Sequence, residues 1–256
     1  MRVWKNWLSV WRETFFSLLS PMKEECLLCK QTSSDGVKQL GLCGACYMRI
    51  PWIRTVVCEI CGRGERCFDC KRRHAYFSKS RSAVRYDETM KDLLARYKYR
   101  GDERLKTVLG QMLMHSFQLL EVNREALNGK FEIKKEYITF VPVSDQRMHE
   151  RGFNQAEQMA LELGRRVGIP VVSLLKRSRH TDKQSFKKRI DRLDDLEHVF
   201  EVDDDLVHKY IKSSSATSFL IYIIDDVYTT GSTMNQCAKI LTVNLPIEVY
   251  GLTWAR

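Results

Sequence analysis

The segment Phe219–Met234 constrains the fold more than any other part of this 256-residue chain. It starts with the apolar run Phe219-Leu-Ile-Tyr-Ile-Ile224, which is typical of a strand buried on both faces of a parallel sheet. Asp225 and Asp226 follow at the predicted end of that strand. Apolar residues then recur at helical spacing, which predicts a helix that begins near residues 232–233. We therefore expect an α/β fold with a parallel sheet.

The loop between this strand and this helix is suited to holding a phosphate group. Gly231 permits a tight turn, and backbone N–H groups at the start of a helix bind anions. Further donors come from the hydroxyl groups of Thr229, Thr230, Ser232 and Thr233. No Lys follows the glycine as in a Walker A loop, and the GxGxxG pattern of dinucleotide sites is absent. The alternative is an ordinary helix N-cap after a strand.

The acidic pair suggests which phosphorylated ligand this loop would hold. Two carboxylates next to a phosphate cradle suit the 2′ and 3′ hydroxyls of a ribose. The run Ile223-Ile-Asp-Asp-Val-Tyr-Thr-Thr-Gly-Ser-Thr233 resembles the PRPP-binding signature of the type I phosphoribosyltransferases. The resemblance implies that Asp225 and Asp226 bind the ribose or its Mg²⁺, and that the loop holds the 5′-phosphate.

Eight of the nine cysteines form four C-x-x-C pairs within residues 22–76. Such pairs are typical zinc ligands, and a zinc bound by four cysteines is structural because no coordination position stays open. The simplest arrangement is two consecutive zinc ribbons, with interleaved pairing and redox chemistry as alternatives. The predicted ligands are Cys26, Cys29, Cys43 and Cys46 for one zinc, and Cys58, Cys61, Cys67 and Cys70 for the other.

Net charge and the chain's N-terminal segment bear on its partners. A formal charge of +10 favours a polyanion, although a generally basic surface is the alternative. Residues 1–21 have an amphipathic helical pattern rich in tryptophan, which suits a partner, a membrane surface or the chain's own zinc module. No apolar stretch reaches the ~18 residues of a membrane span. We expect a cytoplasmic protein whose cysteines stay reduced.

Two loops carry further cations that are candidates for contact with phosphate. A predicted strand at 137–143 is followed by a loop with Arg147 and Arg151, suited to pyrophosphate unless both are merely solvated. Lys98 lies near a glycine at the end of a predicted helix, where a simple helix C-terminus is the alternative. Residues 176–200 are strongly basic, and the resemblance to the phosphoribosyltransferases implies a mobile loop that closes over the site there. The alternative is a flexible basic excursion that binds nothing or binds nucleic acid non-specifically.

Together these features resemble the ComF family of competence proteins, and closely its Gram-positive ComFC branch. The resemblance runs from Cys26 to Trp254. It is carried by the C-x-x-C pairs, by the PRPP-type loop, and by Lys98-Tyr-Arg-Gly-Asp102, Val141-Pro-Val143, Glu150-Arg-Gly-Phe-Asn-Gln155, Thr181, Gln184, Arg189, Arg192 and Phe200. Asp195 departs from the family, whose members often carry Asn there.

The sequence patterns and the resemblance together predict three parts and two functions, although the amphipathic N-terminal segment lies outside the usual family pattern. The parts are an amphipathic helix at 1–21, a zinc module at 22–76 and a phosphoribosyltransferase-like domain at 77–256. One function is the handling of imported single-stranded DNA in transformation, with a helicase-type competence ATPase as partner. This partner would hold the protein at the inner face of the membrane, and any direct membrane association would be peripheral. The other function is transfer of a phosphoribosyl group from PRPP, with Mg²⁺, to an acceptor that the sequence does not reveal.

Overall fold

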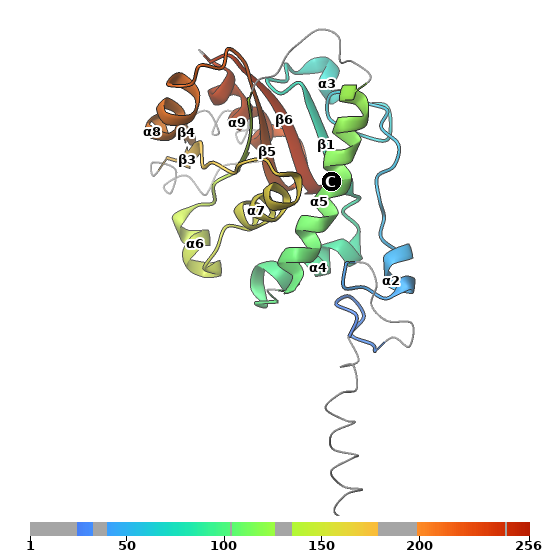
Figure 1. The fold of residues 1–256 in the computed structure, drawn as a ribbon. Coiled ribbons are helices and arrows are strands. Elements are labelled where there is room, and N and C mark those ends of the chain that lie inside the picture. The colour runs from blue at the N-terminus through green and yellow to red at the C-terminus, as the bar shows by residue number, and fades with distance from the viewer. Residues whose placement is uncertain (1–24, 33–39, 103, 126–134, 179–198, 244) are drawn as a thin grey trace, which may run out of the picture. The chain divides into compact units, whose positions relative to one another are not determined.

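The computed structural model describes residues 25–32, 40–102, 104–125, 135–178, 199–243 and 245–256 (Figure 1). The predicted N-terminal helix at 1–21 and most of the predicted basic loop at 176–200 lie outside these residues. The chain forms two compact units, Met1–Arg49 and Ile50–Arg256. The predicted domain boundary between residues 76 and 77 stays a prediction.

The described part of the first unit is a small knuckle followed by a short helix. An antiparallel bridge joins Glu25 to Thr32, and the N–H of Lys30 donates to the carbonyl oxygen of Cys26 across the turn. Lys30 adopts a positive φ of 63°, so the chain reverses within a few residues. Helix α2, Gly44–Met48, then begins directly after Cys43. This geometry brings cysteines from two short segments to one place.

The second unit is built on a four-stranded parallel sheet, which confirms the predicted α/β class. The strand order is β1 (Lys79–Val84), β6 (Ile247–Ala255), β5 (Phe219–Val227) and β2 (Lys135–Phe140), and every neighbouring pair is parallel. The segment 247–254 is predicted from the sequence to close the sheet, but this last strand lies inside it, between β1 and β5. It is buried on both faces, as an inner strand of a parallel sheet is.

Helices cover both faces of the sheet, as the alternation along β5 shows. Ile221 and Ile223 pack in the same core as Cys237 of α9 (Ser232–Thr242), whereas Tyr222 stacks against Phe117 of α5 (Arg104–Glu125). Successive strand residues point to opposite faces, so α9 and α5 lie on opposite sides. Helix α7 (Gln155–Val167) packs beside α5 and against β5 and β2 (Figure 1).

Several loops predicted from the sequence are helical. The predicted loop after β2 contains α6 (Asp145–Arg151), because the side chain of Ser144 accepts a hydrogen bond from the N–H of Arg147 and caps its first turn. The acidic and Ser-rich segment 203–218, whose composition predicts a surface connection, contains α8 (Asp204–Val207), whose first turn is capped by the side chain of Asp203. A short π-helix, His208–Lys212, continues from α8 without a side-chain cap.

The apolar run at 169–175 predicts a further strand, but the structure has only one parallel bridge there, between Val171 and Ile138 of β2. Pro170 has no N–H to donate, which limits a strand there to an edge position. Its carbonyl oxygen still accepts from the N–H of Ile138, so the segment follows β2 for one residue pair. The remaining described elements are α3 (Asp69–Arg72), α4 (Glu88–Tyr99), and an antiparallel pair of β3 (Leu175–Arg177) and β4 (Phe200–Val202).

Candidate functional site

The acidic pair lies at the carboxyl end of β5, inside the strand and not after it. Asp225 is paired in register with Thr253 of β6, and its Oδ1 accepts a 2.8 Å hydrogen bond from the N–H of Asp226. The pKa of Asp225 is raised to about 8, first by burial and then by the charge of Asp226, while the N–H of Asp226 and the charges of Lys98 and Arg147 act against the rise. Without a ligand Asp225 therefore holds a proton at neutral pH.

Two other elements reach Asp226 across the sheet edge. Lys98, in the last turn of α4, forms an ion pair with its carboxylate, and both side chains are largely buried. Gln155, at the start of α7, donates a 2.9 Å hydrogen bond to the same Oδ2 atom. The structure thus joins the predicted phosphate-binding lysine to the predicted ribose-binding carboxylate. Contact of Lys98 with phosphate stays a prediction.

The two predicted pyrophosphate arginines both belong to α6, but their surroundings differ. Burial raises the pKa of Asp225, and the charge of Arg147, an exposed residue, acts against this rise. Arg151 already donates hydrogen bonds to Gln155 Oε1 at 3.0 Å and to the Tyr99 hydroxyl at 2.8 Å. Binding of pyrophosphate by Arg151 would therefore require exchange of these partners.

The predicted phosphate loop joins β5 to α9 through a strained turn. Gly231 has a φ of 78° and is the N-cap of α9. A Cβ atom here would overlap the hydroxyl group of Tyr228, so both conformation and space require glycine. No side chain caps the helix, although the Thr230 and Ser232 hydroxyls lie 2.8 Å apart beside it. The N–H of Ser232 donates to Thr230 Oγ1 at 3.4 Å, and the next N–H groups of the first turn of α9 can bind an anion.

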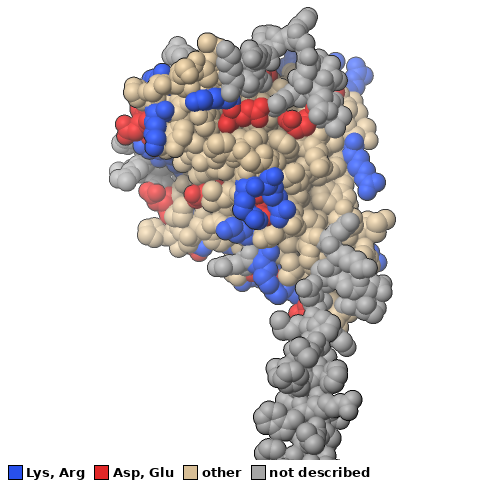
Figure 2. All heavy atoms as spheres, viewed as in Figure 1, with Lys and Arg blue, Asp and Glu red and all other residues tan. Residues whose placement is uncertain are grey.

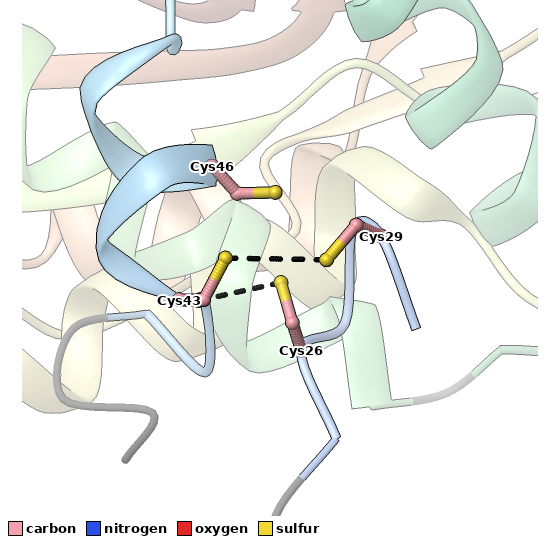
Figure 3. A group of neighbouring side chains, drawn as sticks. All are labelled: Cys26, Cys29, Cys43 and Cys46. Atoms are coloured by element: carbon pink, nitrogen blue, oxygen red, sulfur yellow. Dashed lines mark hydrogen bonds between the residues drawn. The ribbon is translucent and has the colours of Figure 1, made fainter. Parts of the chain in front are cut away.

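The first cysteine group consists of Cys26, Cys29, Cys43 and Cys46, whose side chains point toward one another (Figure 3). The four sulfurs lie within 4.8 Å of one another. The Sγ atoms of Cys29 and Cys43 are 3.9 Å apart, and the N–H of Cys43 donates to Cys26 Sγ at 3.3 Å. A tetrahedral zinc with Zn–S bonds of about 2.3 Å needs sulfurs roughly 3.8 Å apart. The group therefore fits zinc.

The second cysteine group consists of Cys58, Cys61, Cys67 and Cys70, again within 4.8 Å of one another. Cys61 and Cys67 Sγ lie 3.7 Å apart, and both residues belong to the apolar core that contains α9. The guanidinium of Arg256 lies over the ring of Tyr228 and 3.9 Å from Cys61 Sγ. This second site thus packs into the same compact unit as the sheet.

Electrostatics within each group also favour a dication. Burial raises the pKa of Cys26, but N–H groups of the knuckle outweigh it and lower the value to about 6; Cys67 is likewise lowered to about 7. Burial and the neighbouring sulfurs raise the pKa values of Cys46 and Cys70. In each group one cysteine loses its proton readily, and the negative charge of that thiolate then disfavours deprotonation of a second cysteine. Zinc removes this repulsion, so the consecutive arrangement can hold two structural zinc ions.

Charge on the molecular surface is grouped into small patches. On the face seen in Figure 2, Lys and Arg gather in separate clusters with Asp and Glu between them. The +10 charge therefore forms no continuous basic stripe on the described part of this face. None of the described helices is both long and apolar enough to cross a membrane.

Sequence reasoning missed residues that join distant elements. The side chain of Tyr228 packs against Gly231. The side chain of Asn235 in α9 accepts a hydrogen bond from the N–H of Tyr76 at 2.7 Å and donates one to the carbonyl oxygen of His74 at 3.1 Å. Gln155 stood in a run quoted for the family resemblance, but its contact with Asp226 had no local signal. Such contacts form only when the fold brings distant segments of the chain together at the site.

Comparison with known proteins gives relatives that match most of the chain. Competence protein ComFC of Bacillus subtilis is 29% identical over 235 residues, covering 84% of this chain and 88% of the relative. Competence protein ComFC of Streptococcus pneumoniae is 29% identical over 233 residues, covering 85% and 93%. No family model matches the chain.

Among solved structures, a glutamine phosphoribosylpyrophosphate amidotransferase from B. subtilis, complexed with ADP and GMP, matches with a TM-score of 0.36 and 15% identity. The match covers 61% of this chain and 30% of that longer protein. The sequence relatives confirm the predicted resemblance of this chain to the ComF competence proteins, over more than four-fifths of its length.

Proposed function

We propose that this protein takes part in DNA uptake during natural transformation, where it handles imported single-stranded DNA with a ribose-phosphate site. Two relatives match most of the chain, one from B. subtilis and one from S. pneumoniae, and both are named competence proteins. These names support the proposed biological role. The carboxylates at the end of β5, next to the open N-terminus of α9, support the ligand class.

Each part of the site has a separate task in this proposal. The N–H groups from Thr229 to Thr233 hold a phosphate, because the first turn of α9 lacks a capping side chain. Asp225 and Asp226 accept hydrogen bonds from sugar hydroxyls or bind Mg²⁺ with them. Lys98 balances the charge of Asp226 until a ligand binds. The observation that carries the proposal is this acidic pair placed directly before the phosphate loop.

The cations near the site complete the proposal. Arg147 and, after exchange of partners, Arg151 contact further phosphates of the ligand. Zinc at both cysteine groups is structural, because four thiolates fill its coordination sphere. We further propose a helicase-type ATPase as partner and a cytoplasmic location at the inner face of the membrane through that partner. Both rest on the family resemblance.

A second function, phosphoribosyl transfer, is favoured by the same acidic pair and by the Lys98 ion pair with Asp226, together with the charge of Arg147 that acts on Asp225. With PRPP bound, Arg147, Arg151 and Lys98 would stabilise the pyrophosphate that leaves ribose C1, which is electrostatic catalysis. The acceptor would then attack C1 while the carboxylates hold the sugar in position. We name no acceptor, since no base-binding group is apparent beside the acidic pair.

Binding measurements on zinc-loaded protein test the proposal. Isothermal titration calorimetry with PRPP and Mg²⁺ should give binding for the wild type and none for Asp225→Ala/Asp226→Ala. Fluorescence anisotropy should show binding of single-stranded oligonucleotides that weakens as salt increases. A folded wild type that binds no single strand at low salt contradicts the DNA-handling role. Release of pyrophosphate with any base or amine would instead favour the transferase.

A further inference from the structure

A pocket of about 340 Å³ lies between the second cysteine group and the phosphate loop. Its volume is within the ~300–1,000 Å³ of small-ligand sites. Loop residues 230–232 and the first turn of α9 form one wall, and residues from the segment 61–77 form the other. Asp225 and Asp226 are not among the described residues that line it. The pocket therefore adjoins the phosphate loop and not the acidic pair.

This placement bears on what the site binds. A sugar phosphate on the site has its phosphate at the loop and its ring hydroxyls at the acidic pair, which are opposite ends of the molecule. The pocket adjoins only the phosphate end of such a ligand. PRPP and other phosphate monoesters carry no further group on that phosphate, so they would not extend into the pocket. We infer that the pocket holds the nucleotide that is joined, through a phosphodiester, to the phosphate on the loop. This inference rests on the proposed function and identifies the ligand as a DNA strand.

The interior of the pocket suits a nucleoside. Phe77 and Tyr228 lie edge to face with their ring centroids 6.5 Å apart, and both line the pocket. Aromatic and apolar surface of this kind accepts any base, because every base has an apolar face. The neighbouring side chains of Asn235 and Gln236 add polar atoms to the same wall. Recognition there would depend little on base identity.

The charge of the pocket depends on the metal site beside it. Zinc bound by four thiolates would carry two negative charges, which would repel DNA. Arg256, 3.9 Å from Cys61 Sγ, offsets one of them. Arg63 and Asp69 both line the pocket and are paired with each other at 3.3 Å, so together they add no net charge. One negative charge is left, and it is outweighed by the neighbouring cations Lys71, Arg72 and Arg73.

Arg73 is the cation that remains for a phosphate. It is exposed at the rim of the pocket and also lines a second pocket of about 480 Å³. The two pockets share Cys70, Arg73, His74, Ala75 and Phe77, and the second one adds Lys71 and Arg72. A track of cations thus leads away from the loop along 71–74, as a strand with regularly spaced phosphates needs.

The same geometry gives the strand a direction. A strand that leaves the loop phosphate through the pocket continues on the 5′ side of that phosphate. The nucleotide at the acidic pair is then the 3′-terminal one, with its 3′-hydroxyl facing Asp225 and Asp226. A phosphate on that 3′ position removes the hydroxyl group that donates to the carboxylates, so this hydrogen bond is lost. The site should therefore select strands that end in a 3′-hydroxyl.

The test uses the full chain with zinc and short oligothymidylates labelled at the 5′ end, measured by fluorescence anisotropy. Arg73→Gln should weaken binding about tenfold, as expected for one lost charge-assisted hydrogen bond. It should also reduce the slope of log K against log salt by about 0.7. The matched control is Arg165→Gln on α7, which removes a cation whose side chain is 69% exposed. A 3′-phosphate should weaken wild-type binding at least about tenfold.

Each other result overturns the inference in a recognisable way. Equal losses for Arg73→Gln and Arg165→Gln would exclude the pocket while leaving DNA handling intact. Equal binding of strands with and without a 3′-phosphate would exclude the direction. A loss of PRPP binding in Arg73→Gln as large as its loss of DNA binding would assign the pocket to the sugar phosphate itself. A wild type that binds no strand would end both this inference and the proposed function.

Discussion

Replacement of Gly231 by alanine should distort the phosphate loop and destabilise the sheet unit. A left-handed φ of 78° costs a residue with a Cβ roughly 1–2 kcal/mol. The new methyl group would also overlap the hydroxyl of Tyr228, which is 8% exposed and held between Phe77 and Arg256. Such overpacking adds roughly 1–3 kcal/mol. We expect a total of roughly 2–5 kcal/mol.

Gly168→Ala separates the two contributions. Gly168 ends α7 with nearly the same φ, 73°, but nothing lies within 4 Å of the position of its Cβ. It should lose only the conformational part of the stability. For a unit of this size, 1 kcal/mol corresponds to roughly 2–4 °C in Tm. Gly231→Ala should then melt roughly 2–12 °C below Gly168→Ala.

Differential scanning calorimetry of the two zinc-loaded variants measures this difference in Tm. Calorimetric titration with PRPP measures whether the loop of each variant still binds the ligand. Gly231→Ala should lose ligand binding, since Tyr228 and the N–H groups of the turn move together. Gly168→Ala should keep it. If the two variants have the same Tm and both bind ligand, the packing of Tyr228 beneath Gly231 does not set the shape of the loop.

Three further predictions concern charge and metal. Because the pKa of Asp225 is raised to about 8 in the folded state, the folded protein holds a proton that the unfolded chain releases near pH 4. This group's contribution to stability therefore falls as pH rises from about 4 to about 8, and Asp225→Asn should gain Tm over the wild type across that window, with a plateau above it. Lys98→Gln removes the ion-pair partner of Asp226 and a charge that lowers the pKa of Asp225. The upper end of the pH window should therefore move to higher pH. The shift is measured by comparing the Tm of Lys98→Gln with that of Lys98→Gln/Asp225→Asn across the pH range. Cys61→Ser should bind one zinc fewer by elemental analysis and lower the Tm of the sheet unit by on the order of 10 °C, because Cys61 is 1% exposed in its core. Cys29→Ser should also bind one zinc fewer but leave that Tm unchanged, since Cys29 belongs to the other compact unit.

Much of the candidate site was visible in the sequence because its parts are local. The order of strand, acidic pair, glycine turn and helix occupies residues 219–242 without a break, and the structure has β5 and α9 there as predicted. Zinc ligands were equally apparent, because C-x-x-C spacing fixes two thiolates in one knuckle. The consecutive grouping followed from the nearest pairs along the chain and agrees with the sulfur positions.

The exceptions lie where short-range signals conflict or are weak. At 169–175 the apolar run predicted a strand, but Pro170 allowed only a bridge to β2. At 145–151 the polar composition predicted a loop, whereas one capping serine started α6. The position of β6 inside the sheet depends on the order of strands, which no local pattern encodes.

Sequence by itself thus determined the parallel α/β class, the order of strand, acidic pair, glycine turn and helix, and two groups of four cysteines, since each depends on neighbouring residues. Only the tertiary structure decided that Lys98 of α4 and Gln155 of α7 both reach Asp226, and that burial holds a proton on Asp225. It also packed the second cysteine group against α9, so that a pocket opens beside the phosphate loop. These contacts join segments far apart along the chain, and they form only when the sheet brings its carboxyl edge together.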